Sequence, residues 1–285
     1  MKRFVMDIHI TGRCNMNCDF CCGAPKRFLG PNLLNFQKVI NKIKKVGVST
    51  LVFTGGEPLL KPKLDEFIRY AYNQGLEIYL SSNGLLLTEE KYKSISSYLT
   101  VLGLPLDGSS EEMNQKMGRN PQLFKNTLRL LEYFKQNPPS HKVKIGTIVS
   151  SINKDDIINI GRLLFRNKKY YQPDVWRLYE FSPLGKGKKY KFKYTISHES
   201  YNSIVKSVKR KFVNANISPL SNEDSNDSYF FITPVLHLQI LSHNRYIDLG
   251  SLLDIDTKKL KKIISIYQKV REKGSNNRIW IEKNQ

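Results

Sequence analysis

Cysteine is scarce in this chain, and so are long apolar runs and acidic residues. The 285 residues include four cysteines, all between positions 14 and 22, which excludes the distributed disulfide framework of a secreted domain. No run of about 18 apolar residues occurs, so no segment is expected to cross a membrane. The opening residues 1–7 are too few and too polar for a secretory signal. We therefore expect a protein of the reducing cytoplasm.

The shortage of acidic residues leaves a strongly basic chain. There are 46 Lys and Arg against 25 Asp and Glu, a net charge of +21. Lysines scattered over helix faces, such as Lys38 and Lys42, indicate a solvated surface, whereas the denser stretches 186–193 and 206–211 are better candidates for an anionic partner. The charge favours an anionic substrate and leaves open an RNA-binding or RNA-modifying protein.

Strand and helix signals alternate through the first 181 residues. Apolar residues at helical spacing, for example Phe36, Val39, Ile40 and Ile43, are followed by short apolar runs bounded by glycine. Such an order predicts right-handed β-α-β units and a parallel sheet of the α/β class. Six units favour a partial (β/α)6 barrel over a full barrel of eight. The expected strands are 4–10, 50–54, 76–81, 99–104, 143–149 and 175–181, and the expected helices are 33–46, 63–74, one that begins at Thr88, 122–136 and 155–166.

The alternation breaks beyond about residue 190. The pattern there predicts a helix at 199–212, a polar loop at 214–228, a hairpin around Thr233 and Pro234, and a basic amphipathic helix at 257–273. We therefore expect a core barrel over residues 1–190 and an α+β extension over residues 191–285, which closes the mouth or the edge of the barrel.

The cysteines form the most informative motif. Cys14, Cys18 and Cys21 have the spacing C-x3-C-x2-C and follow the first expected strand. Three thiolates suit an iron–sulfur cube that keeps one iron free, whereas electron-transfer clusters ordinarily use four cysteines. A structural zinc site would need a second pair of ligands, and none of the five histidines has that spacing. The adjacent Cys22 is interpreted as a packed or spectator thiol.

Polar turns follow the next strands, at the end where barrel enzymes place their sites. After the second strand, Gly55 and Gly56 allow a ligand to approach the backbone, the Glu57 carboxylate can accept from an ammonium group, and Pro58 fixes the exit direction. Taken alone, this is an ordinary strand-to-helix turn. Further candidates are Ser82 and Asn83 after the third strand, Asp107 after the fourth, Arg119 downstream of it, and Ser150 after the fifth.

Together these motifs resemble the radical S-adenosylmethionine (SAM) superfamily over residues 1 to about 185. The resemblance implies one [4Fe-4S] cluster on Cys14, Cys18 and Cys21, with SAM bound to the free iron. It implies cleavage of SAM to a 5′-deoxyadenosyl radical that abstracts hydrogen from a substrate, with flavodoxin or ferredoxin as electron donor and no general base. Residues 191–285 contain no cysteine, so the auxiliary clusters of many peptide-modifying relatives are not expected.

The resemblance also implies roles for the turn residues. The amino group of SAM would be bound by Glu57 or by the backbone of Gly55 and Gly56, in the turn that ends at Pro58. One departure from the family is Pro105, where relatives carry a small hydroxyl residue. The other implied contacts are Arg119 to the SAM carboxylate, Asp107 to its own loop or a ribose hydroxyl, Ser82 and Asn83 as the family's third-strand turn, and Ser150, Thr147 or Asn153 to the adenosine.

A closer resemblance is to viperin-like enzymes, which dehydrate nucleoside triphosphates, and the core is also similar to MoaA-like members. The resemblance covers segments 18–28, 144–153, 227–232 and 277–280. Two departures are Cys22 in place of an aromatic residue and Gly146 in place of Asn. A peptide substrate in natural-product maturation, RNA, or a sugar or other small metabolite are the alternatives. The residues proposed to contact the phosphates of a nucleotide are Lys26, Arg177, Lys186 and Arg245.

Overall fold

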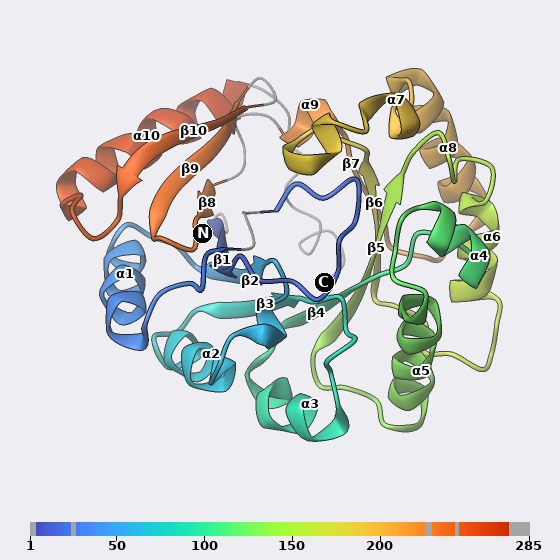
Figure 1. Ribbon diagram of the computed structural model, residues 1–285, viewed down its shortest axis with the longest axis horizontal. Coiled ribbons are helices and arrows are strands. Elements are labelled where there is room, and N and C mark those ends of the chain that lie inside the picture. Colours follow the sequence, from blue (N-terminus) through green and yellow to red (C-terminus); the bar gives the residue numbers. More distant parts are fainter. Residues whose placement is uncertain (1–3, 24–26, 226–229, 243–244, 274–285) are drawn as a thin grey trace.

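The computed structural model describes residues 4–23, 27–225, 230–242 and 245–273, and its strands join in one sheet. The ten described strands have the order β10-β9-β8-β1-β2-β3-β4-β5-β6-β7. Neighbours from β8 through β1 to β7 are parallel, whereas β8, β9 and β10 pair antiparallel. Helices cover the outside of this curved sheet (Figure 1). The fold is therefore α/β with a partial barrel, as the sequence predicted.

Six strand–helix units form the core of the molecule, in agreement with the predicted number. A short additional helix, α4 (Glu111–Lys116), precedes α5. The strands are β1 (Val5–Thr11), β2 (Thr50–Gly55), β3 (Glu77–Ser81), β4 (Val101–Pro105), β5 (Lys142–Val149) and β6 (Val175–Glu180). The helices that follow them are α1 (Leu33–Lys45), α2 (Leu64–Asn73), α3 (Glu89–Ile95), α5 (Gln122–Gln136), α6 (Ile157–Phe165) and α8 (His198–Lys211).

Helix α1 illustrates how the sequence forms these units. Its apolar residues Phe36, Val39, Ile40 and Ile43 are spaced at helical periodicity and are buried. The Asn32 side chain accepts a hydrogen bond from the Asn35 N–H and so caps the first turn. The helix ends before Gly47, whose positive φ of 91° suits glycine. The buried stripe therefore faces the sheet and leaves the lysines in solvent.

The two faces of the sheet differ in chemistry. Trp176 on β6 points outward, where its ring contacts Phe165 at the end of α6 and Phe212 directly after α8. The adjacent residue Arg177 is buried and points inward, as does Tyr179 two positions further along the strand. Because successive strand residues alternate between faces, the barrel encloses polar side chains while apolar residues pack beneath the helices.

The segment after residue 190 adds strands to both edges of the sheet. β7 (Ile217–Leu220) extends the β6 edge, and β8 (Phe230–Ile232) pairs with β1. The antiparallel pair of β8 and β9 (His237–Ser242) confirms the predicted hairpin. The predicted polar loop at 214–228 is wrong over part of its length, because it contains β7 and α9 (Asn222–Ser225). A short apolar strand flanked by polar residues does not show enough alternation to be recognised.

Strand β10 (Arg245–Ser251) and helix α10 (Thr257–Lys273) complete the described chain. The Lys42 ammonium on α1 donates to the carbonyls of Leu252 and Ile255, and α10 packs beside α1 (Figure 1). Among the described helices, none has the length and apolar content needed to cross a bilayer. The division of the chain at residue 190 stays a prediction.

Candidate active site

A cavity opens at the carboxyl-terminal ends of the barrel strands, the end where the sequence placed the polar turns. It has a volume of about 430 Å³ and adjoins a second space of about 700 Å³. Both are bordered by all four cysteines and by Gly56. The larger cavity reaches toward β9 and β10, whereas the first reaches into the barrel as far as Lys144 and Tyr179. The motifs thus meet around one continuous space.

The three cysteines of the C-x3-C-x2-C motif lie in the loop between β1 and α1. Cys18 is buried, Cys14 is half-buried and Cys21 is exposed to the cavity. Each sulfur accepts from one N–H donor, namely Met16 N–H to Cys14 (3.4 Å), Arg119 to Cys18 (3.7 Å) and Gly23 N–H to Cys21 (3.3 Å). Burial raises the pKa of Cys14 and of Cys18, and Cys21 raises each further, whereas the charge of Arg119 opposes the change at Cys18.

This donor set fits a cluster better than a single metal ion. Within the described residues, no three His, Cys, Asp or Glu side chains lie close enough to hold one ion. The ligands of a [4Fe-4S] cube bind different irons and so lie farther apart than the ligands of one ion. Three thiols that border one cavity, each with its own N–H donor, are therefore suited to a cube that keeps one iron open toward that cavity.

Cys22 is not packed in the core, so of its two interpretations only that of a spectator thiol remains. It is exposed and borders both parts of the cavity. The protein around that cavity raises the pKa of its thiol to about 11, and the hydroxyl of Tyr246 on β10 donates to its carbonyl (3.4 Å). The thiol of Cys22 is therefore held neutral beside the three candidate ligands.

The Gly55-Gly56 turn packs against the beginning of the cysteine loop. A Cβ atom on Gly56 would overlap the carbonyl oxygens of Gly12 and Arg13, and Gly55 has a φ of 134° that only glycine adopts readily. The Gly56 N–H donates to the Thr11 carbonyl (2.8 Å). Both glycines border the cavity. They therefore serve close packing of two backbone segments as well as access for a ligand.

Glu57 lies beneath this turn and does not border the cavity. Its carboxylate is 1% exposed and accepts from the Leu59 N–H (3.0 Å), the Ser82 hydroxyl (2.7 Å) and the Asn83 N–H (2.7 Å). Burial raises its pKa, and these donors oppose that change. Pro58 is buried as the first residue of a 3-10 turn. Glu57 thus joins the turns after β2 and β3, and places Ser82 and Asn83 at the cavity wall.

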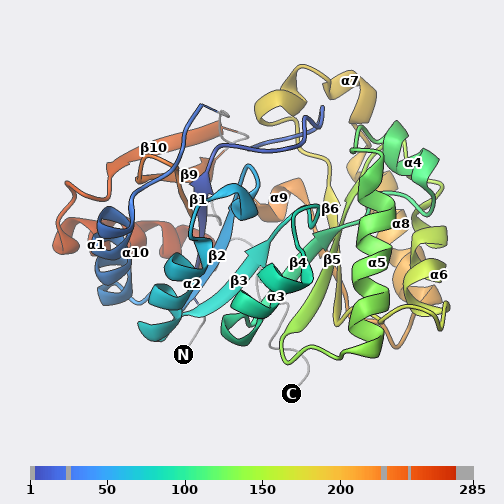
Figure 2. The ribbon, with the colours of Figure 1, turned by 60° about the horizontal axis from the view of Figure 1, so that its bottom comes forward.

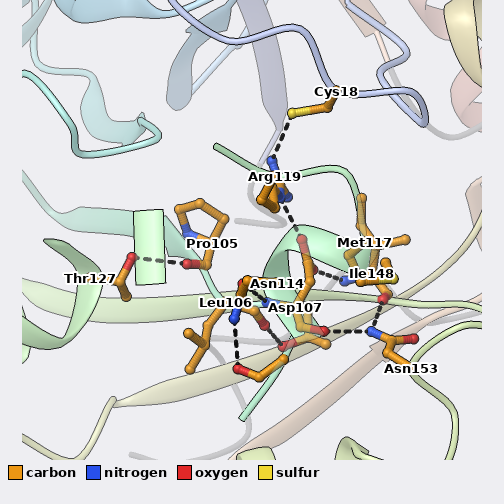
Figure 3. A network of polar contacts seen from close by, with 12 residues as sticks. Cys18, Pro105, Leu106, Asp107, Asn114, Met117, Arg119, Thr127, Ile148 and Asn153 are labelled. Carbon is orange, nitrogen blue, oxygen red and sulfur yellow. Dashed lines mark hydrogen bonds and ion pairs between the residues drawn. The ribbon is translucent and has the colours of Figure 1, made fainter. Parts of the chain in front are cut away.

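Asp107 and Arg119 form one network with Cys18, as Figure 3 shows. Asp107 has no exposed surface and accepts from the Arg119 Nε and from the Ile148 N–H (2.7 Å). The Arg119 guanidinium also stacks over the Phe20 ring at 4.6 Å. The negative charges of Asp107 and Cys18 raise the pKa of Arg119. Both side chains are therefore committed to each other and to the cysteine loop.

The candidates on the fifth strand turn away from the cavity. The Ser150 hydroxyl donates to the Met117 sulfur (3.2 Å) and to the Asn153 Oδ1 (3.2 Å), and the residue is fully buried. Thr147 donates to the Leu106 carbonyl (2.6 Å), and the Asn153 amide donates to the carbonyls of Asp107 and Ile148 (Figure 3). All three are bound within the strand-end turns, so the structure does not bring them to the site.

The four phosphate candidates are not gathered in one place. Lys26 lies outside the described residues, as does the terminal segment 277–280. Arg177 lies deep between β6 and β7, where it donates to the Ser218 hydroxyl, and does not border the cavity. Lys186 borders the outer part of the cavity and pairs with Asp19 (3.3 Å). Arg245 is exposed on β10 and lines neither part.

Sequence analysis missed the residues that line the inside of the barrel. Lys144 on β5 borders the cavity and lies 3.5 Å from the Tyr179 hydroxyl on β6. Asp7 and His9 on β1 border the same cavity, and burial lowers the pKa of His9 to about 4. The alternation of Lys144 with the buried Val143 and Ile145 was the available signal, since it places the lysine on the inward face.

The chain belongs to the radical SAM superfamily, whose family description matches residues 8–164. It is 34% identical over 161 residues to the GTP 3′,8-cyclase of Helicobacter pylori, covering 54% of this chain and 49% of the cyclase. It is 23% identical over 273 residues to an S-adenosylmethionine-dependent nucleotide dehydratase of Flammeovirga pacifica, covering 89% of this chain and 88% of that protein. The chain spans about half the length of the first curated relatives, which include an AdoMet-dependent heme synthase of Methanosarcina barkeri.

Solved structures resemble the chain in fold. SuiB of Streptococcus suis bound to S-adenosylmethionine superposes with a TM-score of 0.70 at 14% identity, covering 94% of this chain and 68% of SuiB. The enzyme named anSMEcpe, bound to AdoMet and a peptide, gives a TM-score of 0.68 at 16% identity, covering 90% of this chain and 79% of that one. At this identity the similarity concerns the fold.

Proposed function

We propose that this chain is a radical SAM enzyme that acts on a nucleoside triphosphate. The observation that supports this substrate class is the position of Lys144. Its ammonium lies inside the barrel, on the wall of the cavity that the cysteines border. A cation there suits an anionic substrate, and the chain as a whole carries a net charge of +21. The match to a nucleotide dehydratase over most of both chains supports the same substrate class.

In this proposal Cys14, Cys18 and Cys21 hold one [4Fe-4S] cluster at the mouth of the barrel. When bound there, the cluster and SAM would together supply the radical chemistry that abstracts hydrogen from the substrate. The N–H donors that contact the three sulfurs stabilise thiolate charge. Arg119 contributes a full positive charge at Cys18, and Asp107 orients that guanidinium. These two are positioning residues rather than direct SAM contacts.

SAM would lie along the wall formed by the turns after β2 and β3. The backbone of Gly55 and Gly56 borders the cavity and is the candidate partner for the amino group, since the Glu57 carboxylate is already used by three donors. Asn83 borders the same wall and also donates to the Asn15 side chain (2.7 Å) of the cysteine loop. Glu57 would act through Ser82 and Asn83 by fixing their turn.

The substrate would enter the barrel beneath SAM. The Lys144 ammonium would bind a phosphate group, with the Tyr179 hydroxyl beside it as a second donor. His9 also borders this cavity and is neutral at physiological pH because burial lowers its pKa to about 4, so it adds no charge there. No side chain has to remove a proton for the hydrogen abstraction.

Anaerobic turnover tests this proposal. The reconstituted protein is given SAM, dithionite and, in parallel reactions, each nucleoside triphosphate, candidate peptides or RNA, and 5′-deoxyadenosine is quantified by mass spectrometry. We expect its formation to depend on a nucleoside triphosphate. Formation that depends on a peptide or on RNA would instead support the corresponding alternative and refute the nucleotide.

A matched pair of variants tests the lysine. Lys144→Met should raise the KM for the nucleotide by about 10- to 100-fold, because a charge-assisted hydrogen bond is worth about 1.5–3 kcal/mol. Lys142→Met is the control, since Lys142 stands on the same strand with its side chain exposed. Equal kinetics for the two variants would remove Lys144 from the substrate site.

A further inference from the structure

The most basic stretch of the chain lies directly on the cysteine loop. It comprises the 3-10 turn Gly185–Lys188 and helix α7 (Lys191–Tyr194), which follow β6, and we call residues 185–194 the lysine segment. It contains five lysines and no acidic residue, namely Lys186, Lys188, Lys189, Lys191 and Lys193. Figure 2 shows α7 at the top of the molecule, beside the blue loop that follows β1.

Backbone contacts fix the lysine segment to the cysteine loop. The Lys186 N–H donates to the Cys21 carbonyl (2.9 Å), and the Lys186 ammonium donates to the Asn17 carbonyl (2.9 Å). Gly185 lies so close that a Cβ there would come within 2.9 Å of the Cys21 carbonyl and 3.0 Å of the Cys22 Cα. The surface above Cys21, one of the candidate ligands, and above the adjacent Cys22 is therefore formed by this segment.

Packing beneath the lysine segment holds it in place on the cysteine loop. The buried Tyr194 ring meets Phe20 of the cysteine loop at 5.6 Å and Phe181 at 5.4 Å, and its hydroxyl donates to the Met117 carbonyl (3.2 Å). Lys186 and Lys193 both pair with Asp19 (3.3 and 3.4 Å). The lysine segment has five lysines and this one carboxylate partner, so four positive charges remain in excess.

The outward face has the features of a binding surface for an acidic protein. Lys188, Lys189 and Lys191 are exposed, and no described acidic side chain pairs with them. Phe192 beside them is 91% exposed, the most exposed large apolar side chain in the described part of the chain. A bare aromatic ring rimmed by like charges is typical of a docking surface, because the ring contributes buried area and the charges steer the partner.

We propose that the lysine segment is the docking surface for the one-electron donor of the cluster, an acidic carrier protein of the flavodoxin or ferredoxin class. The inference rests on the proposed function, which requires one electron for each cleavage of SAM. In the step concerned, the reduced carrier loses one electron and the cluster gains one, and no bond forms or breaks between the proteins. Contact of the segment with the backbone at Cys21 gives the carrier access to the nearest thiolate.

Charge reversal tests the surface. The variant K188E/K189E/K191E changes three exposed lysines that contact neither the cysteine loop nor the cavity. The control K258E/K261E/K262E carries the same change on α10, across the molecule from α7 (Figure 1). Reduction of the reconstituted cluster is followed by the loss of its visible absorbance under anaerobic conditions, with either a reduced acidic flavodoxin or dithionite.

We expect the lysine-segment variant to lower the second-order rate of reduction by flavodoxin about tenfold or more at low ionic strength. The control should stay within about twofold, and added salt should slow the wild type until the variants converge, because salt screens exposed charges. Reduction by dithionite should be the same for all three. Phe192→Ala should weaken flavodoxin binding without changing the salt dependence.

Other results would overturn the proposal. An unchanged rate with flavodoxin, or an equal loss in the α10 control, would show that this surface does not receive the carrier. A parallel loss with dithionite would show that the lysines act on the cluster itself. Retention on RNA that the reversal abolishes, with reduction unchanged, would assign the surface to RNA. Failure of the proposed function is separate, since dithionite would then yield no 5′-deoxyadenosine in the wild type although cluster reduction is still measurable.

Discussion

Two apolar cores of this molecule differ in what builds them. The larger lies between the strands and the outer helices, and Phe36, Phe53 and Trp176 are among its fully buried side chains. The smaller lies at the carboxyl-terminal ends of the strands and is composed of Met16, Cys18, Phe20, Met117, Leu123, Phe181 and Tyr194. One core therefore belongs to regular elements, and the other mainly to the connections between them.

This difference separates stability from function. Strands and helices of the larger core satisfy their own backbone hydrogen bonds, so burial there adds directly to the free energy of unfolding. The smaller core joins three connections that are distant in sequence, and its main consequence is the position of the Cys18 sulfur and the Arg119 guanidinium. We expect substitutions in the first to change stability and substitutions in the second to change cluster retention.

The largest effect should come from the cysteine loop. Cys14→Ala, Cys18→Ala and Cys21→Ala should each abolish cluster loading, because a cube with three protein ligands loses a thiolate, while the unfolding temperature of the apoprotein changes little. Iron and sulfide analysis after anaerobic reconstitution measures the loss. Cys22→Ala is the control and should retain the cluster. A loaded cluster in any of the first three would refute the ligand assignment.

A phenylalanine pair tests the comparison directly. Phe36→Ala should lower the free energy of unfolding by about 3–5 kcal/mol, because its site is enclosed by Phe53 and Phe67 and leaves a cavity. Phe20→Ala should cost about 1–2 kcal/mol, since a loop relaxes more easily, yet it should shorten the lifetime of the loaded cluster. Urea unfolding of the apoprotein and iron retention measure the two effects. If both variants lost the same free energy of unfolding and the same amount of iron, the two cores would not differ in their contributions to stability and to cluster retention.

Glu57 tests the connection between two turns. Glu57→Gln should destabilise the protein by about 1–3 kcal/mol, because the amide presents donors to N–H and O–H groups that require an acceptor. SAM affinity should fall with it, as Ser82 and Asn83 lose their anchor, while the cluster is retained. Glu66→Gln removes an exposed ion pair with Lys63 and serves as the control. Unchanged SAM binding in Glu57→Gln would show that SAM binding does not depend on the contacts of Glu57 with Ser82 and Asn83.

The smallest effect concerns pH. The pKa of His9 falls from 6.5 to about 4 in the folded protein, so the unfolded chain binds its proton first as the pH drops. Stability from this residue is complete above about pH 7 and is lost as the pH falls toward 4, by about 0.7 kcal/mol between pH 7 and 6. His9→Gln should flatten the unfolding temperature of the apoprotein over that range. A wild-type profile already flat there would contradict the neutral, buried histidine.

The sequence predicted the six strand–helix units because each unit carries its own local pattern. A stripe such as Phe36, Val39, Ile40 and Ile43 can bury itself only beneath a helix, and Gly47 marks where that helix ends. The cysteine spacing was equally local, since all three thiols belong to one loop. Strand β7 was missed because four residues are too few to show a period.

Contacts between distant segments could not be predicted from such local patterns. Arg119 was interpreted as a partner of SAM, and Asp107 as a partner of its own loop or of a ribose hydroxyl. The fold brings the two to each other and brings Arg119 to Cys18. Ser150 resembled a ligand contact and is instead part of a strand-end turn. A polar residue after a strand has the same local signature whether it faces a cavity or caps a turn, so sequence cannot separate the two roles.

The sequence by itself determined the α/β barrel, the cysteine motif and the membership in a superfamily, because these depend on periodicity and spacing within short segments. Only the tertiary structure decided that Glu57 lies beneath the cavity wall, that Lys144 lies inside the barrel, and that the lysine segment covers the cysteine loop. Those placements depend on the register and curvature of a sheet that joins residues more than a hundred positions apart, and that information is not local.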